Sequence, residues 1–289
     1  MSSDLTTLQN DHLILAVASM GAEMQYLRTA AGDELLWHGD GAFWTGRAPV
    51  LFPIVGRAVD DQIAVGDHSS ALPQHGFARR NLFELVEQSD TMCHHVLTDT
   101  PETHAAYPFA FSLSLTHRIE GATLHVEARV TNNDAQPMPF GFGFHPAFCW
   151  PLPNADGHPH HVTLASGGAP DLRAIDEGLL RPEPLAGPFV DGDLEIAEHL
   201  FDDGALVFPN GTDSLRYGPK SGTALAFTFH NLPDLALWRP TGAPFLCIEP
   251  WHGTASYVGD GPQIGARPNS ITLPSHQSVA FGYSVTVEG

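Results

Sequence analysis

Apolar residues recur at every second position along much of this chain, and this period of two limits the fold more than any other feature. Phe109–Leu115 alternates apolar with small or polar residues, and Leu124–Val130 repeats the pattern after a Glu120-Gly121 turn. Because successive side chains of a strand point to opposite faces, such segments form strands with one buried face. The two segments are therefore predicted to pair as a β-hairpin.

Further short strands are predicted where the alternation returns between turns. They are expected at Leu13–Ala18, Phe83–Gln88, Cys93–Thr98, Ala224–Phe229, Leu235–Trp238 and Ser278–Val287. The chain has 28 glycines and 24 prolines, and because proline disrupts helix interiors, long helices are not expected. Leu194–Leu200 is predicted to form one short helical turn. Many short strands separated by turns are typical of all-β sandwiches and barrels, and we predict a β-sandwich.

The domain organisation is predicted to be simple. No linker, repeat or low-complexity segment divides the 289 residues. Ala155–Arg181 is rich in glycine, proline and histidine and is predicted to be a long loop on one face. Since β folds of this length commonly form one unit, we predict a single domain over residues 1–289.

Charge and cysteine content narrow the class of partner. Lys and Arg total 13 against 33 Asp and Glu, a formal charge of −20, which argues against nucleic acid or an anionic membrane as partner. Cys93, Cys149 and Cys247 are too few and scattered for a disulfide framework, so reduced thiols in a cytoplasmic protein are expected. Neither a secretion signal nor a membrane span is predicted. A small molecule is the expected ligand, bound by a monomer or a homodimer.

His75 is the first candidate for chemistry. It lies in the segment Gln74–Arg79, where Gly76 lets the backbone turn sharply and approach a ligand. The cationic side chains of Arg79 and Arg80 can position hydroxyl groups or a phosphate beside it. The alternative is a loop histidine that is hydrogen-bonded to a carbonyl group.

A second histidine and a glutamate lie at the ends of apolar strands. His145 follows an aromatic strand that Pro146 ends, and an imidazole facing a cleft there can donate a proton near neutral pH. Glu249 closes another apolar strand; burial would raise its pKa, whereas a neighbouring imidazolium would lower it. Trp238 and Trp251 are candidate stacking faces for a sugar. The alternative for His145 is a hydrogen-bonded core histidine, and for Glu249 a structural ion pair. The two tryptophans could instead be ordinary core residues.

Metal and nucleotide sites have weaker support. In a strand, His94 and His95 of the sequence Cys93-His94-His95 point to opposite faces and cannot share an ion. His158–His161 lies in a polar, proline-broken segment and is predicted to be solvated. The chain has no Gly-x-Ser-x-Gly motif, no phosphate-binding Gly-Lys-Ser/Thr loop and no dinucleotide-binding fingerprint. We therefore predict no metal ion, and the missing motifs argue against the common hydrolases, kinases and dehydrogenases.

Five segments in order resemble the aldose 1-epimerase (galactose mutarotase-like) family, in its LacX-like branch. They are Arg47–Arg57, Gln74–Arg79, Tyr107–Phe109, Gly143–Phe148 and Phe245–Gly253. The resemblance covers almost the whole chain. It implies a large antiparallel β-supersandwich with an open cleft, and catalysis without a cofactor.

The resemblance also implies roles for individual residues. Glu249 would be the base that takes the proton from the anomeric hydroxyl, and His145 the acid that protonates the ring oxygen. His75 would help to hold that oxygen, and Arg57 would bind ring hydroxyls. Family members often use a carboxylate from a middle strand, for which Asp203 is the candidate here.

Three hypotheses follow for function. The first is a cofactor-independent epimerase that interconverts the α and β anomers of a hexose. Because Arg57, Arg79 and Arg80 could bind a phosphate, the second is the same chemistry on a hexose 6-phosphate. The third is a carbohydrate-binding protein that has kept the cleft and lost turnover. A metal-dependent isomerase of the cupin type fits the histidine spacing poorly.

Overall fold

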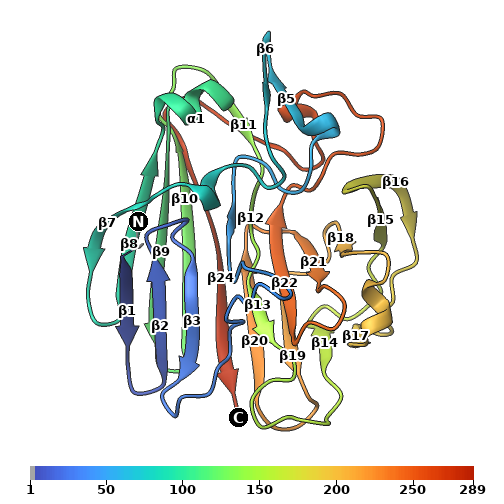
Figure 1. Ribbon diagram of the computed structural model, residues 1–289. Coiled ribbons are helices and arrows are strands. Elements are labelled where there is room, and N and C mark those ends of the chain that lie inside the picture. The colour runs from blue at the N-terminus through green and yellow to red at the C-terminus, as the bar shows by residue number, and fades with distance from the viewer. Residues whose placement is uncertain (1–3) are drawn as a thin grey trace.

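A curved antiparallel sheet of nine strands forms the back of the protein (Figure 1), in a computed structural model that describes residues 4–289. In sheet order the strands are β17 (Asp193–Glu195), β14 (His161–Leu164), β19 (Ser214–Gly218), β20 (Ala224–His230), β24 (Ser278–Glu288), β10 (Thr123–Asn132), β9 (Phe111–Glu120), β8 (Met92–Thr98) and β7 (Glu84–Gln88). The predicted hairpin is confirmed as β9–β10, with Glu120 paired to Thr123.

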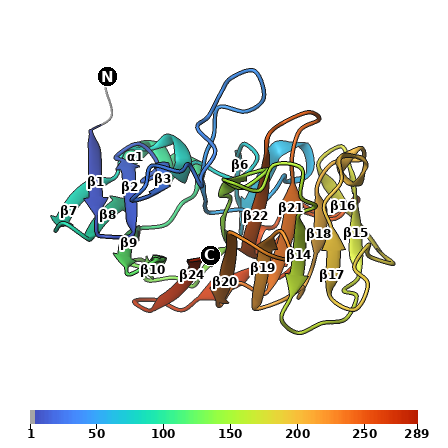
Figure 2. The same ribbon diagram turned by 90° about the horizontal axis from the view of Figure 1, so that it is seen from below.

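Two smaller sheets lie over one face of this sheet (Figure 2). A three-stranded sheet covers the β7–β10 end and consists of β1 (Leu5–Gln9), β2 (Leu13–Ala18) and β3 (Met24–Thr29). An eight-stranded sheet covers the other end, in the order β16 (Leu179–Leu185), β15 (Leu172–Asp176), β18 (Leu206–Phe208), β21 (Asp234–Trp238), β22 (Phe245–His252), β12 (Phe142–Phe144) and β4 (Val50–Leu51), with β13 (Ala147–Cys149) also paired to β22. The all-β sandwich prediction is confirmed.

Two separate strand pairs and short helices complete residues 4–289. The pairs are β5 (Gln62–Val65) with β6 (His68–Ala71), and β11 (Met138–Phe140) with β23 (Ile271–Leu273). The helices are α1 (Pro101–Ala106) and the 3-10 helices η1 (Val59–Asp61), η2 (Ala78–Arg80), η3 (Glu198–Phe201) and η4 (Ile264–Ala266). The predicted helical turn at Leu194–Leu200 overlaps η3 but starts too early, because β17 occupies its first residues. None of these helices is long and apolar enough to cross a membrane.

Alternating burial fixes how the sheets pack. Along β9 every second side chain from Phe111 is buried, so its apolar residues all face the smaller sheets. Aromatic rings join the layers: Phe142 of β12 stacks on Phe281 of β24 with ring centroids 4.8 Å apart. One continuous core includes residues from Leu8 to Val285. This continuity supports a single domain over residues 1–289, which stays a prediction.

The predicted long loop at Ala155–Arg181 is wrong. The segment contains β14 and β15 and the start of β16. Val162 and Leu164 are buried and extend the nine-stranded sheet beyond β19, although the segment's glycine and proline content had indicated a loop. The prediction that the histidines of His158–His161 are solvated also fails for two of them, because His160 and His161 are buried and hydrogen-bonded.

The Phe142–Phe281 stack predicts a large loss of stability on truncation. Phe281→Ala removes a fully buried ring between two sheets and is expected to lower the free energy of unfolding by about 3–5 kcal/mol. Val190→Ala, at a side chain that is 72% exposed, should change it by less than about 0.5 kcal/mol. Urea unfolding followed by circular dichroism measures both values. Equal effects of the two substitutions would contradict the packing described.

Candidate active site

A cavity of about 420 Å³ opens on the eight-stranded sheet beside β21 and β22. Its volume lies within the range of about 300–1,000 Å³ that is usual for small-molecule sites. Its walls come from strands, from the β15–β16 turn and from loops near Trp44, Gly56 and Gln74. Residues far apart in the sequence therefore meet around one space.

His145 and Glu249 meet because of strand register. β12 and β13 both pair with β22, through Gly143 opposite Trp251 and Ala147 opposite Cys247. The register is the same on both sides of the break between β12 and β13, so His145 falls opposite Glu249. Its Nε2 lies 3.2 Å from Oε2 of Glu249.

His75 is held by a reciprocal pair of hydrogen bonds with Gly56. The His75 backbone N–H donates to the Gly56 carbonyl at 2.9 Å, and the Gly56 N–H donates to Nδ1 of His75 at 3.1 Å. A neutral ring whose Nδ1 accepts carries its proton on Nε2. His75 has a φ of 67°, a left-handed conformation that is uncommon for histidine. Gly76 follows with a φ of 69°, and a Cβ there would lie 2.2 Å from the Phe52 carbonyl oxygen.

Tryptophan rings form the apolar walls and fix the His145 ring. Trp44 stacks on His145 with centroids 4.8 Å apart, and Trp238 meets it edge-on at 5.7 Å. Trp251 lines the same cavity. A Cβ on Gly143 would lie 2.4 Å from the Trp251 ring, so only glycine lets this ring lie across the strand. Flat apolar rings beside polar groups suit the C–H faces of a sugar.

Burial decides the charge of the acid–base pair. The Glu249 side chain is 2% exposed, and its burial raises the pKa of the carboxyl group well above the ordinary value. Burial is also the main cause that lowers the pKa of His145 to about 3, with the positive charge of Arg79 second. Both groups are thus driven toward their neutral forms. At 3.2 Å the two groups are close enough to exchange a proton, so their titrations are coupled.

The same effects keep His75 neutral. Burial lowers its pKa well below the ordinary value, and positive charge on His145 or Arg79 would lower it further. Burial also lowers the pKa of the Arg79 guanidinium. The cavity therefore contains a neutral N–H donor in His75, an acid–base pair in His145 and Glu249, and a cation in Arg79.

The structure brings six predicted site residues together and leaves two outside. The six that line the cavity are Glu249, His145, His75, Arg79, Trp238 and Trp251. Arg57 is instead half-buried beside a neighbouring hollow, where Asp61 pairs with it at 2.9 Å and the Glu177 carbonyl accepts from it. Asp203 is exposed and does not line the cavity, because the chain turns inward only at Gly204-Ala205. Among the described lining residues Glu249 is the sole carboxylate.

Three contributors escaped the sequence analysis. Trp44 and Gln74 line the cavity, and only Gln74 lies in a segment that drew attention. Arg267 is buried beneath the wall and donates to the carbonyls of Val55 at 2.6 Å and Thr254 at 3.0 Å. It thereby ties together the two loops that present Gly56 and Ala255 to the cavity. Arginine in a loop carries no sequence signal for this role.

One group at the cavity wall, which includes the fully buried Cys247, has the donors that a metal ion requires. A ring nitrogen of His145, the Cys247 thiol and a Glu249 oxygen lie within 4.8 Å of one another. These residues could hold a divalent ion such as Zn²⁺. The prediction of metal-free chemistry stays a prediction.

The site geometry defines a class of protein. An acid–base pair, a fixed N–H donor and aromatic walls can move protons to and from a sugar-sized ligand. A β-sandwich that carries such a cavity is what a sugar-binding isomerase requires.

Comparisons with known proteins agree with this class. The family model for aldose 1-epimerase matches residues 4–286. Protein LacX (plasmid) of Lactococcus lactis subsp. lactis is 26% identical over 297 residues, covering 97% of this chain and 98% of that protein. A galactose mutarotase-like protein from Lactobacillus casei ATCC 334 superimposes with a TM-score of 0.90 and 28% identity, over 99% of this chain and 100% of that one. A galactose mutarotase related enzyme from Lactobacillus acidophilus superimposes with a TM-score of 0.93 and 24% identity, over 99% of this chain and 98% of that one.

The chain belongs to the aldose 1-epimerase family. The predicted resemblance and the galactose mutarotase-like fold are therefore confirmed. Family membership supports an epimerase-type enzyme that binds a sugar.

The dominance of burial makes the protonation of His145 testable. Since the pKa of His145 is lowered to about 3, its ring should stay neutral as the pH falls from about 8 to about 5. Nitrogen-15 NMR of histidine-labelled protein measures the ring, with His145→Asn assigning the signal by difference. Protonation near neutral pH would show that attraction to Glu249 outweighs burial.

Proposed function

We propose that this protein is a cofactor-independent aldose 1-epimerase that interconverts the α and β anomers of a hexose. The observation that carries the proposal is the 3.2 Å contact between His145 Nε2 and Glu249 Oε2 inside a tryptophan-lined cavity. One proton shared by the pair supplies an acid and a base at once.

The proposed cycle leaves the proton count of the pair unchanged. The proton that rests on Glu249 first moves to His145, after which the Glu249 carboxylate takes the proton of the anomeric hydroxyl while His145 protonates the ring oxygen. The bond from C1 to the ring oxygen breaks, and rotation about C1–C2 exposes the other face of the aldehyde. Reversed transfers close the ring and return the proton to His145, from which it moves back to Glu249. Each positioned transfer contributes about 10²–10⁴-fold in rate.

His75 acts as a fixed donor in this proposal. Because its Nδ1 accepts from Gly56, its proton lies on Nε2, 3.3 Å from the Gln74 side-chain amide, and a sugar ring oxygen would accept that proton in place of the amide. The His75 and His145 rings lie edge-to-face with centroids 5.6 Å apart, close enough for both to contact one pyranose. A neutral donor there stabilises the developing charge without competing for the shared proton.

Removal of either partner of the pair should abolish most of the rate. Glu249→Gln keeps the size of the side chain and loses the base, and His145→Asn keeps a polar side chain and loses the acid; each is expected to lower kcat/KM about 10²-fold or more. Polarimetry of freshly dissolved α-glucose or α-galactose measures the rate. Glu87→Gln, on the exposed strand β7, is the control and should match wild type.

Two outcomes would contradict the epimerase proposal. If wild type is no faster than buffer on a panel of hexoses and hexose 6-phosphates, yet calorimetry detects sugar binding, the protein is a carbohydrate-binding protein. If a chelator abolishes activity below the unfolding temperature, a metal held by His145, Cys247 and Glu249 takes part in the reaction.

One observation favours a phosphorylated sugar as a second candidate substrate. The Arg79 guanidinium lines the cavity and donates to the Gln74 carbonyl at 3.0 Å, and no carboxylate of residues 4–289 forms an ion pair with it. A cation without a carboxylate partner suits a phosphate group.

Arg79→Ala tests this candidate against Arg57→Ala. Arg79→Ala should raise KM for a hexose 6-phosphate at least about tenfold and leave the free hexose little changed, because one charge-assisted contact is lost. Arg57→Ala removes an arginine that is already paired outside the cavity, so it should affect the two substrates alike. Equal losses for both substrates with Arg79→Ala would exclude a phosphate site at this residue.

A further inference from the structure

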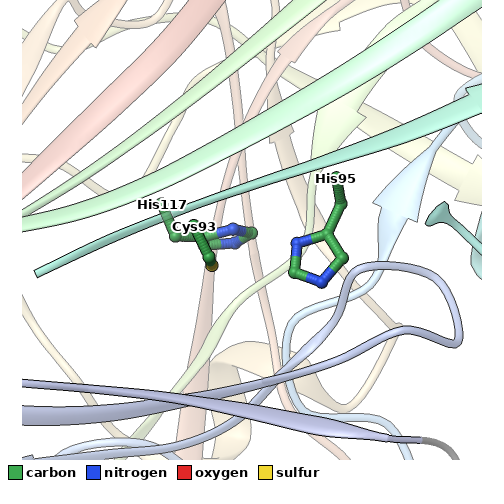
Figure 3. A group of neighbouring side chains, drawn as sticks. All are labelled: Cys93, His95 and His117. Atoms are coloured by element: carbon green, nitrogen blue, oxygen red, sulfur yellow. The ribbon is translucent and has the colours of Figure 1, made fainter. Parts of the chain in front are cut away.

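A second cluster of reactive side chains lies away from the cavity, on strands β8 and β9. Cys93 and His95 are two residues apart on β8 and therefore project from the same face. His117 of β9 is the direct cross-strand partner of Cys93. Figure 3 shows the three side chains gathered on one side of the strands. The alternation that separates His94 from His95 thus places Cys93 beside His95.

This cluster is entirely buried. Cys93 and His95 are 0% exposed and His117 is 2% exposed. The face that carries them is the one covered by the three-stranded sheet, whose strand β1 contacts both β8 and β9 (Figure 2). Their neighbours on the same face are apolar: Leu97 on β8 and Leu115 on β9. Apolar side chains therefore surround the three polar side chains of this cluster.

The histidines lack the hydrogen bonds that buried imidazoles normally have. Within residues 4–289, neither ring nitrogen of His95 has a partner, and Nδ1 of His117 has none. Buried polar atoms in native proteins are nearly always paired, because an unpaired one loses its hydration without compensation. Leucine would fit the pattern of these strands at lower cost. The unpaired nitrogens can therefore bind a ligand without giving up a hydrogen bond to the protein.

The donor atoms already lie close to coordinating positions. One ligand atom from each of Cys93, His95 and His117 lies within 4.8 Å of the other two. Metal bonds of about 2.0–2.3 Å to nitrogen and sulfur place ligand atoms about 3.6 Å apart. Binding of one ion therefore requires the side chains to rotate toward one another.

We propose that Cys93, His95 and His117 form a binding site for a thiophilic transition-metal ion, with Cu⁺ preferred over Zn²⁺. One thiolate and two imidazoles are the donor set that such ions select, whereas Mg²⁺ and Ca²⁺ require oxygen. With Cu⁺ the thiolate makes the complex electrically neutral, and with Zn²⁺ a net positive charge stays buried. Because burial of an unpaired charge is costly and no carboxylate belongs to the cluster, neutrality favours the monovalent ion.

The two histidines have the protonation state that metal binding requires, whereas the cysteine must lose a proton. Burial lowers the pKa of His95 to about 4 and that of His117 to about 3, so both rings are neutral and have a lone pair to donate. Burial raises the pKa of the Cys93 thiol to about 12. The thiol therefore loses its proton to solvent as the metal–sulfur bond forms, and one proton is released for each ion bound.

Metal analysis of the full-length, untagged protein tests the site. Because the cluster is fully buried, the protein is loaded with Cu⁺ under anaerobic, reducing conditions both by long incubation and by refolding, and in parallel with Zn²⁺. We expect one Cu⁺ per chain after desalting, weaker retention of Zn²⁺ and a rise of several degrees in the unfolding temperature. Tighter retention of Zn²⁺ would overturn the charge-balance preference.

Variants separate this site from the Cys247 group in the cavity. Cys93→Ser and His117→Asn should lose the ion and the rise in unfolding temperature. His94→Ala, on the opposite face of β8, and Cys247→Ser should keep both. Retention of the ion by Cys93→Ser, or its loss with Cys247→Ser, would overturn the assignment.

X-ray absorption spectroscopy of the metal-loaded wild-type protein identifies the ligands directly, so this test does not depend on the folding of any variant. We expect one sulfur and two imidazole ligands, whereas the cavity group would give one sulfur, one imidazole and one carboxylate oxygen. No bound metal after both loading routes would also overturn the proposal.

Discussion

The register of β22 is the constraint on which the candidate site depends. β12 and β13 pair with it in one register, and the break between them puts His145 opposite Glu249. A slip of one residue would turn Glu249 to the other face of the sheet. Core packing prevents this slip, because Phe142 and Phe148 on the interrupted strand contact aromatic rings of the nine-stranded sheet. The interactions that stabilise the sandwich therefore also position the acid–base pair.

Burial of the polar groups in this cavity is unfavourable for stability and favourable for proton transfer. Enclosing Glu249, His145 and His75 costs hydration, and each group responds with a pKa shifted toward its neutral form. A neighbouring imidazolium would instead have lowered the pKa of Glu249, but desolvation dominates. In a dry environment a proton shared by two groups moves between them with little rearrangement of water, and the field of Arg79 is screened less than at a surface.

The positions of strands were predictable from the sequence, and the contacts between residues of different strands were not. Alternation predicted β2, β8, β20, β21 and β24 within a residue or two, since side-chain direction depends only on neighbours in sequence. Motifs rich in glycine, proline and aromatic residues identified His75, His145 and Glu249. By contrast, the place of Arg57 depends on its pairing with Asp61, and Cys93 meets His117 only through the register of β8 and β9. No local pattern contains that information.

Some residues that line the cavity lie on paired strands, and others lie on connecting segments. Glu249 and Trp251 stand within β22, and His145 lies at the break between two strands that pair with it, so the hydrogen-bond ladder limits their movement. Trp44 and Gly178 approach from connecting segments, which tolerate insertion and substitution far better. Evolution can therefore reshape the mouth of this cavity, and with it the choice of ligand, while the reactive interior stays unaltered. Divergent relatives should differ most in these connecting segments and least along β22.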